Sequence, residues 1–362
     1  MNRPSFKFVL PWAVGLCAAL VGCGGGADAP ASAVADASKA PTFAVADARK
    51  APASARAASA AHSIHPAIRF GRGSKETLLI GTSNQTIVQV EPRSGKVMAT
   101  LNVPTRPTHI AADETNIYFG GWLGRYDLAT REIAYFALSD GYTEAVAMAI
   151  SPGGTLFASN LYFFRPDTSC GTCSTVVAYP DPSGMNPEST IHFFYGYVRP
   201  LAGGEGVLSG QQIGFTDEAK LLVTSAAGDG IFVSDAPVAE VCCGHTELAF
   251  KVLVADDTHT TLRFALRGHK RLLVLHSSGS LDEHDLATGR LVRPVLQAGT
   301  VDPLDLIVAR DGTLYVLEKS GQIRVFSKRG RERGRVTLPA GAGQAVSLAL
   351  CCGAPPHGKH HR

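Results

Sequence analysis

The sequence predicts an all-β fold, a six-bladed β-propeller that occupies residues 65–352 of the 362-residue chain. The first observation is that short apolar runs bounded by Gly, Asp, Ser and Pro, which are typical of strands, begin near residue 68. The second is that six of these runs are versions of one strand, with starts separated by 39, 39, 65, 51 and 42 residues. All-strand repeats of roughly 40 to 50 residues are typical of propeller blades. The six runs begin at Thr77, Asn116, Thr155, Lys220, Arg271 and Thr313.

The hairpins that follow these strands also repeat. Residues 126–130 (YDLAT) match residues 284–288 (HDLAT), and residues 90–97 (VEPRSGKV) are a looser copy. This pattern resembles the outer hairpin of quinoprotein-like, YVTN and NHL propellers, in which a turn such as D-x-x-T-G-K-x joins the outer two strands. The resemblance extends over most of residues 68–352 and implies the fold. It implies no function, because these families include scaffolds, binders and enzymes.

The count of six blades depends on the end of the chain. Residues 346–350 (VSLAL) match the innermost strand at residues 146–150 (VAMAI), but no second strand follows them, while the first blade lacks an innermost strand. We therefore expect the last strand to complete the first blade and close the ring. The interval of 65 residues is too short for two blades, and we assign residues 162–173 to an insertion between a second and a third strand.

The N-terminus has the layout of a secretory signal peptide, with Arg3 and Lys7 before an apolar stretch over residues 9–21. The stretch is shorter than the roughly 20 residues that a spanning helix needs. Residues 20–23 (LVGC) resemble the lipobox of bacterial lipoproteins. The resemblance implies cleavage after residue 22 and a lipid anchor on Cys23, and Gly24 in the following position implies the outer membrane. The alternative is ordinary signal cleavage, with Cys23 an incidental thiol.

Residues 23–64 form a separate region, rich in Ala, Pro and Ser and poor in large apolar side chains. Residues 33–41 recur with small changes at 44–52. Such a composition cannot offset the entropy of ordering the chain, so we expect a flexible tether, with a surface helix as the weaker alternative. Removal of residues 1–22 lowers the formal charge from +3 to +1, which gives no electrostatic reason to expect a nucleic acid or an anionic surface as partner.

Polar residues should surround the mouth of the central channel, where the innermost strands begin. Counting residues back from each repeated strand locates two equivalent positions at the start of each innermost strand, and so two sets of residues. From these sets we take five candidate ligand-binding residues: Glu144, Gln212, Arg263, Asp302 and Asp305. The first set, at the strand starts, is Thr108, Ala147, Gln212, Arg263, Asp305 and Ser347. The second, three residues earlier, is Thr105, Glu144, Ser209, Thr260, Asp302 and Gln344. The alternative is purely structural, because any wet channel mouth must be polar and Arg263 could pair with Asp305 on the next blade.

The leading functional hypothesis is a lipid-anchored binding or assembly module of the cell envelope, with an envelope protein or a small molecule as ligand. We assign no catalytic residue, cofactor or metal. The alternative is a propeller enzyme, a lactonase-like hydrolase or a lyase. Six-bladed lactonases hold calcium at this end with Glu, Asn and Asp, but Glu144 and Asp302 should lie three blades apart, too far to share one ion. No His and Glu pair stands out as in the streptogramin lyases.

Six cysteines besides Cys23 fall into three close pairs, for which an exported protein favours disulfides. The first pair would staple the insertion, and the other two invite bridges between adjacent residues. The pairs are Cys170/Cys173, Cys242/Cys243 and Cys351/Cys352. Residues 353–362 are rich in His and basic residues; we expect a disordered tail, with zinc or copper binding as the alternative.

Overall fold

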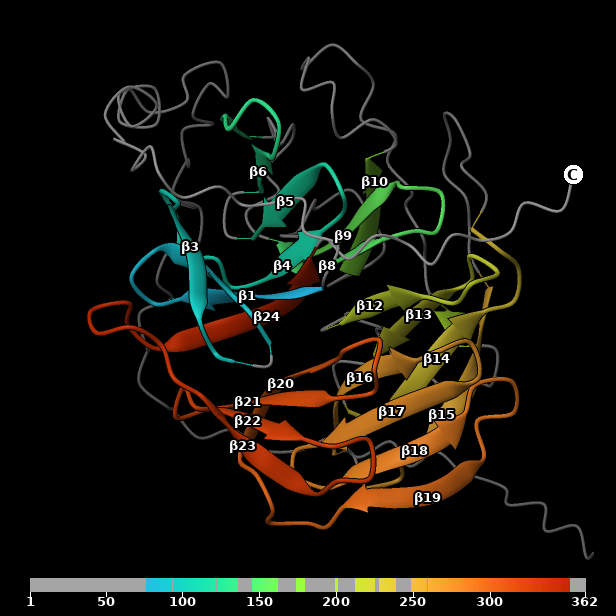
Figure 1. Cartoon of the computed structure of the whole chain (residues 1–362). Coiled ribbons are helices and arrows are strands. Elements are labelled where there is room, and N and C mark those ends of the chain that lie inside the picture. The colour runs from blue at the N-terminus through green and yellow to red at the C-terminus, as the bar shows by residue number, and fades with distance from the viewer. Residues whose placement is uncertain are drawn as a thin grey trace, which may run out of the picture. The chain divides into compact units, whose positions relative to one another are not determined.

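A computed structural model describes residues 76–92, 94–120, 123–135, 145–161, 174–179, 199–200, 212–224, 228–238, 249–258 and 260–351 (Figure 1). These residues form 24 strands and no helix, so none of them belongs to a helix that could cross a membrane. The predicted signal peptide (1–22), Cys23, the tether (23–64) and the tail (353–362) lie outside the described residues.

The strands form six sheets, which we number in chain order and which are antiparallel apart from one added strand in sheet 4. Sheet 1 is β24(Ala345–Cys351), β1(Thr77–Thr82), β2(Thr86–Val90) and β3(Val97–Asn102). Sheet 2 is β4(Ile110–Ala112), β5(Asn116–Phe119), β6(Gly124–Asp127) and β7(Ile133–Tyr135). Sheet 3 is β8(Ala145–Ile150), β9(Leu156–Leu161) and β10(Ser174–Tyr179).

Sheet 4 is β12(Ile213–Phe215), β13(Leu221–Thr224), β14(Gly230–Ser234) and β15(Ala249–Ala255), with β11(Arg199–Pro200) added in parallel to β15. Sheet 5 is β16(Thr261–Arg267), β17(Arg271–His276), β18(Leu281–Asp285) and β19(Leu291–Leu296). Sheet 6 is β20(Pro303–Val308), β21(Leu314–Glu318), β22(Ile323–Phe326) and β23(Glu332–Val336). Five sheets therefore have four or more strands, and sheet 3 has three within the described residues.

The hydrophobic core shows that the sheets form a closed ring. It consists of six clusters of buried side chains, and each cluster lies between two neighbouring sheets, including sheets 6 and 1. Strand β1 illustrates the cause: Leu78 and Ile80 pack with sheet 6, while Leu79 points the other way and packs with sheet 2. A strand that is covered on both faces needs a continuous apolar run rather than alternation. The fold is a β-propeller, as predicted.

The predicted closure is confirmed. In Figure 1 the red strand β24 lies beside the blue strand β1, and their antiparallel register pairs Ile80 with Leu348 and Leu78 with Leu350. The six repeated runs are likewise confirmed as the second strands of the six sheets, β1, β5, β9, β13, β17 and β21. Residues 162–173, the predicted insertion, separate β9 from β10 and lie outside the described residues.

The repeated outer hairpins have the predicted turn. In sheet 5 the carboxylate of Asp285 accepts hydrogen bonds from the Thr288 N–H (3.1 Å) and hydroxyl (2.9 Å), and the Gly289 N–H donates to the Asp285 carbonyl (2.8 Å). In sheet 2 Asp127 and Thr130 make the same turn. A side chain that caps its own turn fixes the register of the two outer strands.

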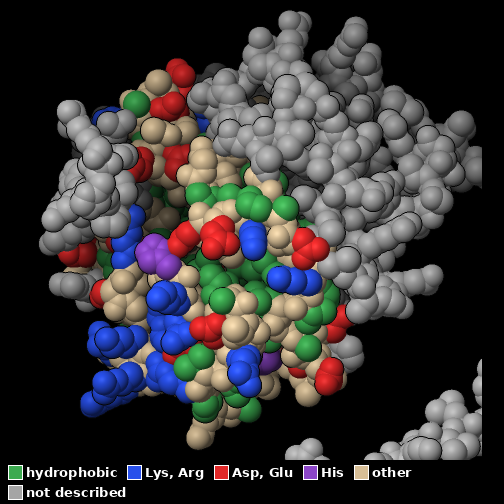
Figure 2. Space-filling model, turned by 90° about the vertical axis from the view of Figure 1, so that its right-hand side faces the viewer, with side chains coloured by type: hydrophobic (Ala, Val, Ile, Leu, Met, Phe, Trp, Pro, Cys, Tyr) green, Lys and Arg blue, Asp and Glu red, His purple; other side chains and the backbone are tan. Residues whose placement is uncertain are grey.

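Charge is unevenly distributed over the surface. Figure 2 shows Lys and Arg side chains gathered on one part of the face that is in view, while acidic side chains are scattered over the rest of it. The near-neutral charge of the chain therefore hides a local excess of positive charge.

We predict that Gly289→Ala destabilises the fold more than Gly95→Ala. Both glycines hold the same place in their hairpins and have similar φ angles of 69° and 68°, so the backbone strain of the substitution is matched. A Cβ at Gly289 would collide with the Leu253 carbonyl of the neighbouring sheet, whereas a Cβ at Gly95 meets nothing within 4 Å. Urea unfolding should give Gly289→Ala a loss about 1–3 kcal/mol larger. Equal losses would show that this contact between sheets 4 and 5 is loose.

Candidate functional site

The predicted channel mouth lies where the innermost strands begin. Ala147, Arg263, Asp305 and Ser347 stand opposite the fifth residue of their repeated second strands, so they are equivalent positions. A β-bulge precedes each of the four. Bulges re-aim the side chains beside them.

Thr108 is not the equivalent residue in sheet 2. The Gly120 N–H donates to the His109 carbonyl, so His109 holds this place and the count from the sequence is wrong by one. The physical reason is the hairpin between β4 and β5. Only two residues separate Asp113 from its partner Asn116, whereas three separate Ala309 from Thr313 in sheet 6.

Three residues at these positions bind backbone groups of the next sheet's innermost strand or of the segment that leads into it. The Gln212 side-chain amide donates to the Phe264 carbonyl (2.7 Å) and accepts from the Phe264 N–H (2.6 Å). One oxygen of Asp305 accepts from the Leu348 N–H (3.1 Å). Phe264 and Leu348 each directly follow the repeated position, so the same bond links sheet 4 to 5 and sheet 6 to 1. Ser347 continues the series by donating to the Pro107 carbonyl (2.5 Å).

Arg263 and Asp305 form the ion pair that was considered from the sequence, with 3.8 Å between the arginine Nε and a carboxylate oxygen. Burial raises the pKa of Asp305 above its usual value, while Arg263 and the N–H groups of Leu306 and Leu348 oppose the rise. Three of the five predicted ligand-binding residues, Gln212, Arg263 and Asp305, therefore hold neighbouring sheets together.

The second predicted set acts mainly through the backbone. The carbonyls of Thr260, Asp302 and Gln344 accept from the N–H groups of Ser277 (2.7 Å), Lys319 (2.9 Å) and Ser83 (2.8 Å), each at the same place in its sheet. The side chain of Asp302 makes an exposed ion pair with Lys319 (2.8 Å). Thr105 is half-buried, while Glu144 and Ser209 lie outside the described residues.

A cluster beside Thr260 was missed from the sequence. The buried carboxylate of Asp256 accepts hydrogen bonds from the hydroxyls of Thr258, Thr260 and Thr261. Burial by itself raises the pKa of Asp256, but these bonds outweigh it and hold the pKa well below the usual value. The only signal in the sequence was the dense polar run DDTHTT at residues 256–261.

His276 lies between two carboxylates of this region. Its Nδ1 is 3.3 Å from Asp256 and its Nε2 is 3.4 Å from Asp282. Nδ1 also lies 3.1 Å from the Thr260 hydroxyl, whereas Nε2 is buried and makes no hydrogen bond, so His276 is held at the rim through Nδ1. Within the described part of the chain, no group of three His, Cys, Asp or Glu side chains is arranged to hold a metal ion.

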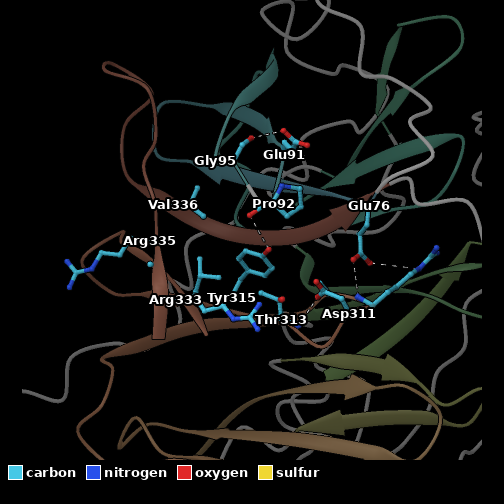
Figure 3. Close-up of a pocket in the computed structure, with 15 residues that line it drawn as sticks. Glu76, Glu91, Pro92, Gly95, Asp311, Thr313, Tyr315, Arg333, Arg335 and Val336 are labelled. Carbon is cyan, nitrogen blue, oxygen red and sulfur yellow. Dashed lines mark hydrogen bonds and ion pairs between the residues drawn. The ribbon is translucent and has the colours of Figure 1, made fainter. Parts of the chain in front are cut away.

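A pocket of about 610 Å³ lies between sheets 6 and 1 (Figure 3). It is formed by the β20–β21 turn, strand β23, the β2–β3 turn and Glu76, which precedes β1. Tyr315, which is 2% exposed, lies at its base and donates to the Pro92 carbonyl (3.4 Å). No residue of this pocket was predicted, because turns of two sheets far apart in the sequence build it.

The acidic side chains of the pocket are already hydrogen-bonded. Glu76 accepts from the Arg310 N–H (2.9 Å), Glu91 from the Ser94 hydroxyl (2.6 Å) and Asp311 from the Thr313 N–H (2.9 Å). Arg333 differs, since it has no carboxylate partner among the described residues. In Figure 3 its side chain extends below Tyr315 towards Thr313, whereas the side chain of Arg335, which also lines the pocket, extends in the other direction. Arg335 contacts Gln322 (3.0 Å) and Glu332 (3.8 Å).

Of the paired cysteines, only Cys351 lies among the described residues, buried at the end of β24. Cys170, Cys173, Cys242, Cys243 and Cys352 lie outside them. The three disulfides therefore stay predictions.

Comparisons with known proteins support the fold but indicate no function. No known family matches the sequence, and neither does any curated protein. A protein of unknown function from Bacteroides caccae has a similar structure, with a TM-score of 0.51 and 15% identity over 76% of this chain and 98% of that one. Structures with lower scores include a functionally unknown protein from Desulfotomaculum acetoxidans (0.49, 13% identity, 76% and 99% covered) and AztD from Citrobacter koseri (0.46, 12% identity, 76% and 97% covered).

We predict that Gln212→Ala lowers the free energy of unfolding by about 1–3 kcal/mol, because it leaves the backbone groups of Phe264 without partners. Gln344→Ala is the matched control, since this glutamine is exposed at the same mouth and its side chain makes no hydrogen bond among those described. It should change stability by less than about 0.5 kcal/mol. Urea unfolding measures both. A Gln212 variant as stable as the control would return this residue to the set of candidate ligand-binding residues.

Proposed function

We propose that the chain is a β-propeller binding module of the cell envelope that takes a small anionic ligand in the pocket between sheets 6 and 1. The observation that carries the proposal is Arg333, an arginine directed into a cavity of about 610 Å³ without a carboxylate partner among the described residues. Arg333 is exposed, and its guanidinium fork has the geometry to pair with a carboxylate of a ligand.

The rest of the pocket restricts the ligand. The hydroxyl of Thr313 lies near Arg333 in Figure 3, and the carboxylates of Glu76 and Glu91 can each accept a further hydrogen bond. A ligand that fits this pocket carries an acid group to pair with Arg333 and several hydroxyls to donate to Glu76 and Glu91. A polyhydroxy carboxylate of sugar size has this chemistry.

Attachment to the membrane is the second part of the proposal. We expect cleavage before Cys23, acylation of this cysteine and retention in the outer membrane, with residues 24–64 as the tether that lets the propeller reach its ligand. The support is the sequence LVGC at the end of an apolar run. Two or more acyl chains anchor a protein stably, whereas a single chain binds reversibly.

The binding test uses gluconate, a sugar-sized polyhydroxy carboxylate, and sorbitol, its uncharged counterpart. Calorimetric titration of the mature chain should show gluconate binding and at least about tenfold weaker sorbitol binding, since loss of one charge-assisted bond is worth about 1.5–3 kcal/mol. Arg333→Gln should weaken gluconate binding to the same extent. Arg331→Gln, on the same hairpin but not among the residues that line the pocket, should leave it unchanged. Equal binding of the two compounds, or no effect of Arg333→Gln, would refute the ligand class.

The alternative, a propeller enzyme of the lactonase or lyase kind, makes a different prediction. Such an enzyme would hold a stoichiometric calcium ion at the channel mouth, where Glu144, Asp302 and Asp305 supply carboxylates. Elemental analysis of the purified chain should find none if the binding module is correct. One calcium ion per chain would favour the enzyme.

A further inference from the structure

Three segments that are distant in the sequence bring eight basic side chains together on sheets 5 and 6. The segments are the β16–β17 turn, the start of β19 and the β22–β23 hairpin. We call this set the basic face: Arg267, Lys270, Arg271, Arg290, Arg293, Lys328, Arg329 and Arg331. Figure 2 shows Lys and Arg side chains gathered in one area of that side of the molecule.

A single buried carboxylate organises the basic face. Glu283, whose side chain is 4% exposed, bridges Arg267, Arg271 (3.7 Å) and Arg293 (2.7 Å). Asp285 adds one bond to Arg271 (2.8 Å). Burial lowers the pKa of Arg267, and the charges of Arg293 and Arg271 lower it further. These three arginines therefore repel one another, and they outnumber the two carboxylates that pair with them.

The β22–β23 hairpin is bound to this centre. The Lys328 carbonyl accepts hydrogen bonds from Arg267 (3.0 Å) and Arg293 (3.0 Å), which fixes the hairpin beside β19. The side chains of Lys328, Arg329 and Arg331 are exposed, and no carboxylate pairs with them in the described part of the chain. The same holds for Lys270 and Arg290. The acidic residue that follows the hairpin, Glu332, turns to Arg324 instead (2.5 Å).

Exposed apolar side chains lie next to these cations. On β19, Leu291 is 59% exposed and Val292 45% exposed, and they stand between Arg290 and Arg293. On the adjacent sheet Val252 is 48% exposed; its neighbour Leu253 lies against Gly289 of the β18–β19 turn. Within the described residues Met98 is the only other large apolar side chain as exposed as these. A soluble polyanion matches the cations and leaves the apolar side chains in water.

We propose that the basic face docks onto a membrane surface with anionic headgroups, with Leu291, Val292 and Val252 entering the interface between headgroups and acyl chains. Anionic headgroups match the unpaired cations, each worth on the order of a few-fold in affinity, and shallow insertion removes the apolar side chains from water. The contact is separate from the pocket of sheets 6 and 1 and from the lipid on Cys23. It would hold the propeller in one orientation on the bilayer.

The experiment uses the mature chain, residues 23–362, with Cys23→Ser so that no acyl chain contributes. Sedimentation with vesicles of phosphatidylcholine alone is compared with vesicles in which about a quarter of the lipid is phosphatidylglycerol. Binding to the anionic vesicles should be at least about tenfold stronger and should weaken with added salt. Reversal of three charges on the hairpin, by Lys328→Glu, Arg329→Glu and Arg331→Glu, should abolish this difference.

The matched control reverses three basic residues of sheets 1 and 2, by Lys96→Glu, Arg106→Glu and Arg131→Glu, and should retain most of the binding. Leu291→Ser with Val292→Ser should weaken vesicle binding at high salt, where insertion dominates. Thermal unfolding of each variant shows whether the fold is kept. Equal binding to both kinds of vesicle, or equal loss in the control, would overturn the proposal. So would binding of inorganic polyphosphate by a chain that does not bind the vesicles.

Discussion

The pairing of β24 with β1 is the constraint on which the rest of the structure depends. The two strands come from opposite ends of the described chain, and the Thr77 hydroxyl donates to the carbonyl of Cys351, 274 residues away (3.4 Å). β24 is buried on both sides. Ala345 and Leu348 pack in the cluster with sheet 6, while Ala349 and Cys351 pack in the cluster with sheet 2. One strand therefore completes two of the six interfaces.

Closure also explains the chemistry of the channel mouth. In a closed ring each innermost strand lies beside the innermost strands of the two adjacent sheets. Buried polar groups at the starts of these strands therefore find their hydrogen-bond partners across the sheet boundaries. Gln212, Asp305 and Ser347 do this with side chains that reach the backbone of the next sheet. Polar character therefore serves assembly at these three positions, whereas sheet 3 has Ala147 at the equivalent place. Among the described residues, those of the proposed ligand pocket come instead from strand β23 and from the β2–β3 and β20–β21 turns.

Much of the fold could be predicted from the sequence because the second strands, covered on both faces, must be apolar throughout. The site could not be predicted in the same way. A repeat gives the position of Gln212 or Arg263 but not the group that each contacts, and one shortened hairpin was enough to shift the assignment from His109 to Thr108.

The pocket and the basic face were beyond sequence reasoning for a related reason. Each gathers turns from sheets that are neighbours in space but separated by tens or hundreds of residues. The run KRGRERGR at residues 328–335 signals charge, yet only the fold shows that Arg333 lines a pocket while Lys328, Arg329 and Arg331, exposed like it, do not. Net charge is a sum over the chain and does not report such clustering.

Truncation of the C-terminus tests the central claim most directly. A chain that ends at Gly341 lacks β24, so β1 becomes an open edge and two hydrophobic clusters lose a wall. Each fully buried side chain removed costs about 1.5–3 kcal/mol, and we expect this chain to aggregate or to unfold without a cooperative transition. A chain that ends at Gly353 keeps β24 and should unfold in urea as the complete chain does. A soluble protein ending at Gly341 that unfolds cooperatively would contradict the account.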